Sequence, residues 1–162
     1  MDIVAFEPRT PNDHSADDFS KRASVFATTD SIWSIYYAVL DRSFGKRHLN
    51  AALQFREQER WSQIHYFFSV VFRSMEKEPW RPGFVYLVPR SGFEQQPPYA
   101  VQSWTVLDPH FANEHIVKPI CRLRVHPSAF PLLGRVRVHE DEAIIRAQAE
   151  DPLGFPWPYT FR

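Results

Sequence analysis

The chain has 162 residues and equal numbers of basic and acidic side chains, 19 Lys and Arg against 19 Asp and Glu, so its formal net charge is zero. A neutral chain lacks the net positive field that wrapping of nucleic acid or of an anionic membrane requires. The single cysteine excludes an intrachain disulfide, and 15% aromatic residues exclude a disordered chain. The 14 prolines against five glycines predict a structure rich in strands and extended connections, because helix interiors exclude proline.

Length and hydropathy predict one domain over residues 1–162, since a chain of this size buries roughly 70% of its unfolded surface. No stretch reaches the about 18 consecutive apolar residues of a membrane helix, and the first ten residues lack the pattern of a secretory signal. We therefore expect a cytoplasmic protein. Residues 8–18 are expected to form an exposed loop, and 151–162 a proline-rich tail packed across the body.

The first half of the chain predicts a strand followed by helices. Residues 22–28 are typical of a short strand, and 31–42 place their apolar side chains at helical spacing behind Asp30, a natural N-cap. Residues 49–61 keep a weaker helical spacing and predict a second helix.

From residue 64 the pattern indicates strands, over 64–72, 84–88, 99–107 and 116–125. Residues 127–134 suit a short helical turn, and 139–150 a further helix. Short connections between strands favour antiparallel pairing. The expected class is α+β, with mainly antiparallel sheets, one well-defined helix at about 31–42 and one or two lesser helices.

Several familiar catalytic patterns are absent. The sequence has no glycine-rich phosphate loop, no nucleophile elbow and no paired CxxC, and its seven histidines show no metal-ligand spacing, so no metal is expected. His110 and His115 lie in what looks like a polar loop. Cys121 lies within a predicted strand without a visible base, which favours a buried packing residue over a nucleophile.

The neutral total conceals a basic segment between His115 and His139 that contains no acid. Its members are Lys118, Arg122, Arg124, Arg135 and Arg137. Arg122 and Arg124 are expected on one side of a strand, from which two guanidinium groups can bind phosphates or carboxylates. The alternative is a solvated face whose arginines pair with the acidic residues 140–142.

The turn FATTD at 26–30 is a further candidate site. Its threonine hydroxyls and the free backbone donors at the start of the helix could bind a phosphate or a carboxamide. The same residue types also serve in ordinary helix capping, and this second interpretation stays open.

Four segments carry a resemblance to a known family. They are FEPR (6–9), VFATTDSIWSIYYAVLDR (25–42), PGFVYLVPRSGFEQ (82–95) and VKPICRLRVHPSAFPLL (117–133). They resemble a group of small bacterial proteins that are distantly similar to the ADP-ribosyltransferase and RNA 2′-phosphotransferase superfamily. The resemblance implies binding of NAD or ADP-ribose in a cleft between two small antiparallel sheets.

The resemblance also implies roles for individual residues. Where such a transferase places a catalytic glutamate on a strand, this sequence has Gln102, which can hydrogen-bond a ribose, and Glu94 is the nearest acid upstream. The implied catalytic residues are Arg9, Thr28, Glu94 and Gln102. Among the implied ligand-binding residues, Thr29 would line the nicotinamide or ribose, Tyr36 or Tyr37 would stack on a ring, and Arg90 would meet phosphate. A nucleotide-binding module on the same fold would also use Arg122 and Arg124 for phosphate and Trp104 for stacking on a base.

Three functions remain open on the sequence. The chain could transfer or hydrolyse the ADP-ribosyl group of NAD, with an unspecified acceptor that includes RNA ends. Nucleic acid is not expected as a partner, although RNA ends stay open as an acceptor. The chain could instead be a catalytically silent nucleotide-binding module. It could also be a protein-interaction domain or homodimer, because Trp, Tyr and Arg dominate such interfaces.

Overall fold

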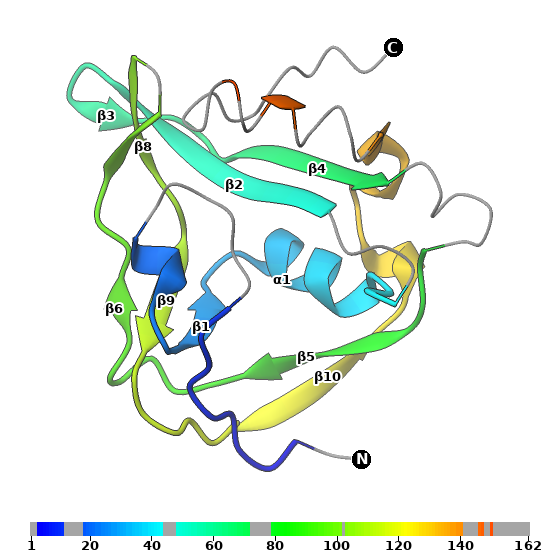
Figure 1. The fold of residues 1–162 in the computed structure, drawn as a ribbon. Coiled ribbons are helices and arrows are strands. Elements are labelled where there is room, and N and C mark those ends of the chain that lie inside the picture. The colour runs from blue at the N-terminus through cyan, green and yellow to red at the C-terminus, as the bar shows by residue number, and fades with distance from the viewer. Residues whose placement is uncertain are drawn as a thin grey trace.

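A computed structural model describes residues 3–11, 18–43, 48–71, 79–101, 103–140, 146, 147 and 150. The fold is α+β, as predicted: one helix lies between small, mainly antiparallel sheets (Figure 1). The predicted tail at 151–162, Gln102 and most of the predicted helix at 139–150 lie outside the described residues. None of the described helices is both long and apolar enough to cross a lipid bilayer.

The helix α1 spans Ser31–Val39 and is shorter than the predicted 31–42. Asp30 caps it as expected, because its Oδ1 accepts a 2.6 Å hydrogen bond from the backbone N–H of Trp33. The face of α1 that carries Trp33, Tyr36 and Val39 is buried.

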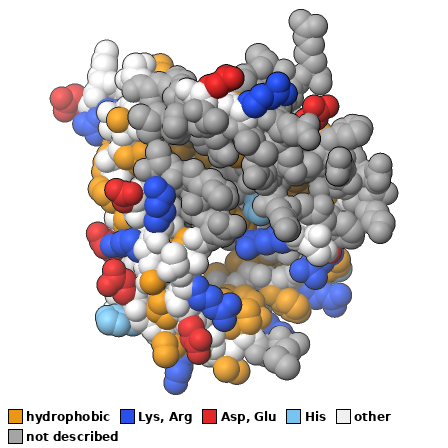
Figure 2. All heavy atoms as spheres, in the orientation of Figure 1, with side chains coloured by type: hydrophobic (Ala, Val, Ile, Leu, Met, Phe, Trp, Pro, Cys, Tyr) orange, Lys and Arg blue, Asp and Glu red, His pale blue; other side chains and the backbone are white. Residues whose placement is uncertain are grey.

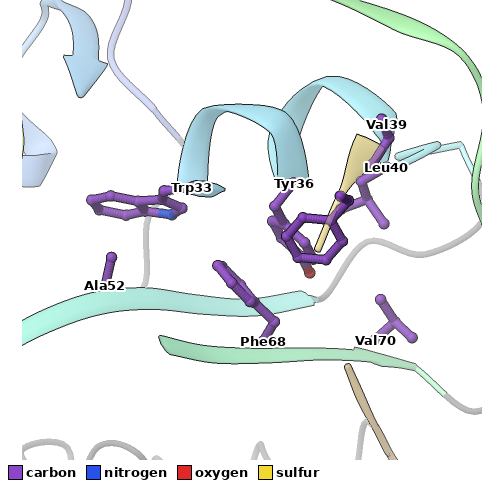
Figure 3. Close-up of a cluster of buried hydrophobic side chains, with 8 residues drawn as sticks. Trp33, Tyr36, Val39, Leu40, Ala52, Phe68 and Val70 are labelled. Atoms are coloured by element: carbon purple, nitrogen blue, oxygen red, sulfur yellow. The ribbon is translucent and has the colours of Figure 1, made fainter. Parts of the chain in front are cut away.

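The main core lies between this face and the neighbouring sheet (Figure 3). The ring of Tyr36 stacks on Phe68 with centroids 4.3 Å apart, and Phe130 closes the same cluster. The core therefore joins residues that are far apart in sequence.

A three-stranded sheet has the order β1-β9-β6. Its antiparallel strands are β1 (Val25–Thr28), β9 (His110–Asn113) and β6 (Glu94–Gln95). The 3-10 helix η1 (Phe19–Lys21) precedes β1. Within the expected loop at 8–18, the backbone of Arg9 is paired with that of Ser24.

A larger sheet has the order β11-β4-β2-β8-β7. Its strands are β2 (His48–Glu57), β4 (His65–Val71), β7 (Tyr99–Val101), β8 (Trp104–Leu107) and β11 (Arg137–His139), and β3 (Arg60–Trp61) pairs with the end of β2. All of these strands pair antiparallel except β11, which is parallel to β4.

Several sequence predictions are corrected here. The helix expected over 49–61 is wrong: these residues form β2 and β3, because pairing of β2 with β4 from His48 to Leu53 overrides a weak helical spacing. The strand expected over 99–107 is a hairpin of β7 and β8. His110 lies in β9 and not in a loop, and His139 ends β11 and does not begin a helix.

The ribbon of β5 (Gly83–Leu87) and β10 (Cys121–Val125) is a separate two-stranded sheet. Figure 1 shows it on the side of α1 opposite to β2 and β4. The 3-10 helices η3 (Pro127–Ala129) and η4 (Leu133–Arg135) follow β10 and confirm the predicted helical turn at 127–134.

Candidate functional site

One face of the three-stranded sheet gathers polar and aromatic side chains. Side chains alternate between the two faces of a sheet, and Thr28 pairs with His110 while Glu94 pairs with Ala112. The shared face therefore carries these residues from the three strands and their immediate ends: Ser24, Phe26, Thr28, Glu94, Gln96, His110 and Ala112. We call this surface the β1–β9–β6 face.

His110 lies at the centre of this face. Its Nδ1 is 3.0 Å from Oε1 of Gln96, whose side chain is buried. With the amide oxygen of Gln96 as acceptor, Nδ1 of His110 is the donor in this contact. The rings of Phe19, Phe26 and Trp33 surround the imidazole at centroid distances of 5.8, 5.0 and 5.6 Å.

Asp30 connects the end of β1, the start of α1 and strand β4. Its backbone N–H donates to Oγ1 of Thr28 at 3.0 Å, and its Oδ2 accepts a 2.7 Å hydrogen bond from the hydroxyl of Tyr66. Burial and then this hydrogen bond raise the pKa of Tyr66, so its hydroxyl stays protonated. Trp33 completes the connection by donating from Nε1 to Oδ1 of Asn50 at 2.8 Å.

These contacts bear on the two interpretations of the turn at 26–30. The backbone donor of Trp33 and the hydroxyl of Thr28 both hold Asp30, and its carboxylate occupies the helix start. A carboxylate at this position repels phosphate. These contacts support the interpretation of the turn as a helix cap.

Arg22 lies at the other end of the β1–β9–β6 face. Its Nη1 is 2.9 Å from Oε2 of Glu94 and 3.9 Å from Oε1 of Glu114, and its guanidinium lies 4.2 Å from the centroid of Phe19. Arg22 thus brings a positive charge to the same sheet face that carries Thr28 and His110.

The predicted catalytic residues are partly brought together. Thr28 and Glu94 share the β1–β9–β6 face, separated by strand β9 and offset along it by two residues, which corresponds to about 12 Å. Arg9 is exposed beside the start of β1 through its pairing with Ser24. Glu94 lies in β6, at the edge of the three-stranded sheet.

The predicted ring-stacking residues lie elsewhere. Tyr36 is 0% exposed and its ring is stacked on Phe68, so neither face of the ring is open to a ligand and its predicted stacking role is wrong. Tyr37 is half-buried with the guanidinium of Arg42 4.7 Å from its centroid. Trp104 is exposed at the start of β8, beside Phe55.

The other predicted ligand-binding residues are also dispersed. Thr29 is exposed and its N–H donates to the carbonyl of Pro109 at 3.3 Å. Arg90 lies over Phe111, which points to the opposite side of β9 from His110. Arg122 and Arg124 belong to the ribbon strand β10. Cys121, expected to be buried, is exposed on the same strand.

Sequence reasoning missed Arg22, Tyr66, Gln96 and His110 as members of one cluster. Arg22 could have been found, because Arg22, Ser24, Phe26 and Thr28 stand at every second position and would share one face of an extended strand. The other three come from strands whose pairing no local pattern reveals.

Among the described residues, no three His, Cys, Asp or Glu side chains are grouped so that they could hold a metal ion. Comparisons with protein-family models, with curated proteins and with solved structures find no match for this chain.

Proposed function

We propose that the chain binds an NAD- or ADP-ribose-type nucleotide on the β1–β9–β6 face and transfers or hydrolyses the ADP-ribosyl group there. The observation that supports the proposal most is the shared face of Thr28, His110 and Glu94, which the registers of β1, β9 and β6 establish. The sequence resemblance and the arrangement of small sheets around one helix agree with it.

The chemistry of this face suits the parts of such a ligand. The half-buried ring of Phe26, whose centroid lies 5.0 Å from that of the His110 ring, can pack against a nicotinamide or adenine ring. The hydroxyl of Thr28 can hydrogen-bond a ribose or a carboxamide. Arg9 is exposed at the Ser24 end and supplies positive charge for phosphates.

Glu94 is the proposed reactive carboxylate. Its side chain is 64% exposed, so a substrate can reach it, and Arg22 holds one of its oxygens. A carboxylate stabilises the positive charge that develops on the ribosyl carbon when the bond to nicotinamide breaks. The role of Arg22 in this proposal is to position that carboxylate.

Calorimetric titration of the full chain with NAD, ADP-ribose and ATP tests the binding. We expect NAD or ADP-ribose to bind and the Thr28→Val variant to bind about tenfold more weakly, the loss of about one hydrogen bond. Thr105→Val is the matched control, because Thr105 is exposed on β8. Equal affinities of the two variants, or no heat with any nucleotide, would contradict the proposed site.

Chromatographic detection of nicotinamide and ADP-ribose tests the reaction separately. We expect Glu94→Gln to keep the nucleotide affinity and to lose turnover by about a hundredfold, the scale of one lost electrostatic contact to a transition state. Binding by the wild type without any product would reject the transferase and leave a nucleotide-binding module.

A further inference from the structure

The ribbon strand β10 presents an open sheet edge. One edge of β10 pairs with β5 through residues Cys121 to Val125, and no strand among the described residues pairs with the other edge. The first four residues of β10 are exposed, and only Val125 is half-buried. An exposed strand edge has free backbone donors and acceptors that can pair with a further strand.

Along β10, arginines alternate with uncharged side chains. Leu123 is 51% exposed and shares its face of the strand with Cys121, whereas Arg122 and Arg124 project from the other face. Just before the strand, Ile116 and Ile120 are 63% and 70% exposed. Figure 2 shows hydrophobic side chains next to Lys and Arg side chains over the part of the molecule where Figure 1 places β5 and β10.

The sequence segment that contains β10 carries charges of one sign. No acidic residue occurs between Ile116 and His139 in the sequence, and this segment contains Lys118 and four arginines. Lys118, Arg124 and Arg135 take part in no ion pair among the described residues. The alternative is that residues 140–142 pair with the arginines of this segment. Glu140 forms no ion pair with a described residue, and residues 141 and 142 lie outside the described residues.

We propose that the open edge of β10 binds an extended acidic peptide segment of a partner protein, which adds to the ribbon as a third strand. Backbone pairing along an open edge supplies affinity, and alternate side chains supply specificity. Acidic residues at alternate positions of the peptide face Arg122 and Arg124, and an apolar residue between them covers Leu123. This proposal does not depend on the nucleotide proposal, because β10 belongs to a different sheet from β1, β9 and β6.

A second copy of the chain fits this edge poorly. In an antiparallel pairing of two β10 strands centred on Leu123, Arg122 of one copy lies opposite Arg124 of the other. Like charges directly opposite each other destabilise a strand pair. Nucleic acid fits it poorly as well, since phosphates would match the arginines but leave the apolar side of the strand and the backbone edge uncovered.

Fluorescence anisotropy of the full chain with a labelled, capped peptide of sequence Thr-Glu-Val-Glu-Val-Thr tests the proposal. The matched probe is Thr-Lys-Val-Lys-Val-Thr. We expect the acidic peptide to bind with a Kd of about 10–100 μM and to bind more weakly as salt is raised. Arg124→Glu is expected to weaken binding of the acidic peptide about tenfold and to strengthen binding of the lysine peptide.

The control variant is Arg60→Glu, which reverses an exposed charge on β3, in a different sheet, and should leave both affinities unchanged. Amide resonances of residues 121–125 should shift on addition of the acidic peptide. The proposal is overturned if the two peptides bind equally or if neither binds at about 1 mM. It is also overturned if Arg60→Glu changes binding as much as Arg124→Glu does. Tighter binding of a single-stranded RNA than of the acidic peptide overturns it too.

Discussion

Asp30 is the residue on which the start of α1 depends most. It accepts hydrogen bonds from the backbone of Trp33 and from the hydroxyl of Tyr66, so it joins the helix to strand β4. We expect Asp30→Ala to lower the free energy of unfolding by about 2–3 kcal/mol, because it removes both the cap and a charge-assisted hydrogen bond. Asp30→Asn keeps the cap and should cost only about half as much.

A double-mutant cycle in urea measures the coupling of this pair. Tyr66→Phe alone should cost about 1–2 kcal/mol, and the cost of the Asp30→Ala, Tyr66→Phe double variant should be less than the sum of the two single costs. Asp18→Ala is the control, because the exposed Asp18–Lys21 ion pair should contribute little. Strictly additive costs would show that Asp30 and Tyr66 do not stabilise the fold together.

His48 predicts an acid-sensitive step in stability. Burial, followed by repulsion from Arg42 and His139, lowers the pKa of His48 from 6.5 to about 4. Between these values the unfolded chain binds a proton that the folded chain does not, so the free energy of unfolding falls as the pH drops from 6.5 towards 4. The loss is at most about 3.5 kcal/mol, since one pKa unit corresponds to about 1.4 kcal/mol.

Urea denaturation at several values between pH 7 and pH 4 measures this step. We expect His48→Gln to show a shallower decline in stability than the wild type, and His126→Gln, which replaces an exposed imidazole, to keep the wild-type decline. The same slope in His48→Gln and in the wild type would assign the acid sensitivity to other groups.

Single residues differ in how far their sequence context reveals them. The cap at Asp30 could be predicted because the polar turn and the apolar helical spacing are adjacent in the chain. The same spacing places Tyr36 with Ile32, Val39 and Leu40, which already indicated burial and not ligand stacking. His110 could not be assigned, because its contacts with Phe19, Trp33 and Gln96 all depend on tertiary structure.

At the scale of elements, β2 shows why a periodic pattern can mislead. Leu49, Ala52 and Leu53 fit one helical face, yet apolar residues also occupy every second position from Leu49 to Phe55. In the structure Ala52 packs into the core beside α1, and Ala51 and Leu53 belong to a second cluster with Val106 of β8. A strand buried on both faces carries apolar residues at most positions, which blurs the period of two.

Gly83 fixes the distance between α1 and the ribbon. A Cβ atom built on Gly83 would overlap the carbonyl oxygen of Ala38 and lie 2.7 Å from its carbonyl carbon. Because both partners are backbone, neither can move without separating the helix from β5. We expect Gly83→Ala to lower the free energy of unfolding by about 3 kcal/mol, at the upper end of the costs of overpacking.

Gly134→Ala is the matched control for this prediction, since a Cβ atom there has no neighbour within 4 Å. It should leave stability unchanged or raise it by about 0.5 kcal/mol, because alanine restricts the unfolded chain. Thermal unfolding of the two variants gives the comparison. A Gly83→Ala variant as stable as Gly134→Ala would mean that α1 and β5 are not in tight contact.

At the scale of the whole molecule, the proline excess is explained by where the prolines lie. None of the described strands or α1 contains a proline, whereas Pro82, Pro109 and Pro127 come directly before β5, before β9 and at the start of η3. This confirms the prediction of a strand-rich chain with fixed connections. Composition predicted the class of fold in this way, but it contained no information on which strands pair.

The whole fold is expected to unfold as one unit, because α1 contacts β1, β5 and β10 and packs its buried face on β2 and β4. Phe68 is the test of this coupling: it is 4% exposed and contacts Tyr36, Tyr66 and Phe130. Phe68→Ala should lower the free energy of unfolding by about 3–5 kcal/mol. Typical domains have about 5–15 kcal/mol in total, so this one change should remove a large share of the stability of every sheet.

The matched control is Phe84→Ala on β5. Phe84 is 42% exposed, so this substitution should cost about 1 kcal/mol. Urea denaturation followed by tryptophan fluorescence and by far-ultraviolet circular dichroism measures both variants. If the sheets share one core through α1, the two signals coincide in each variant and only the midpoint moves. If the two signals of Phe68→Ala showed separate transitions, the three-stranded sheet would keep its structure without the core around Tyr36. The β1–β9–β6 face would then not depend on that core.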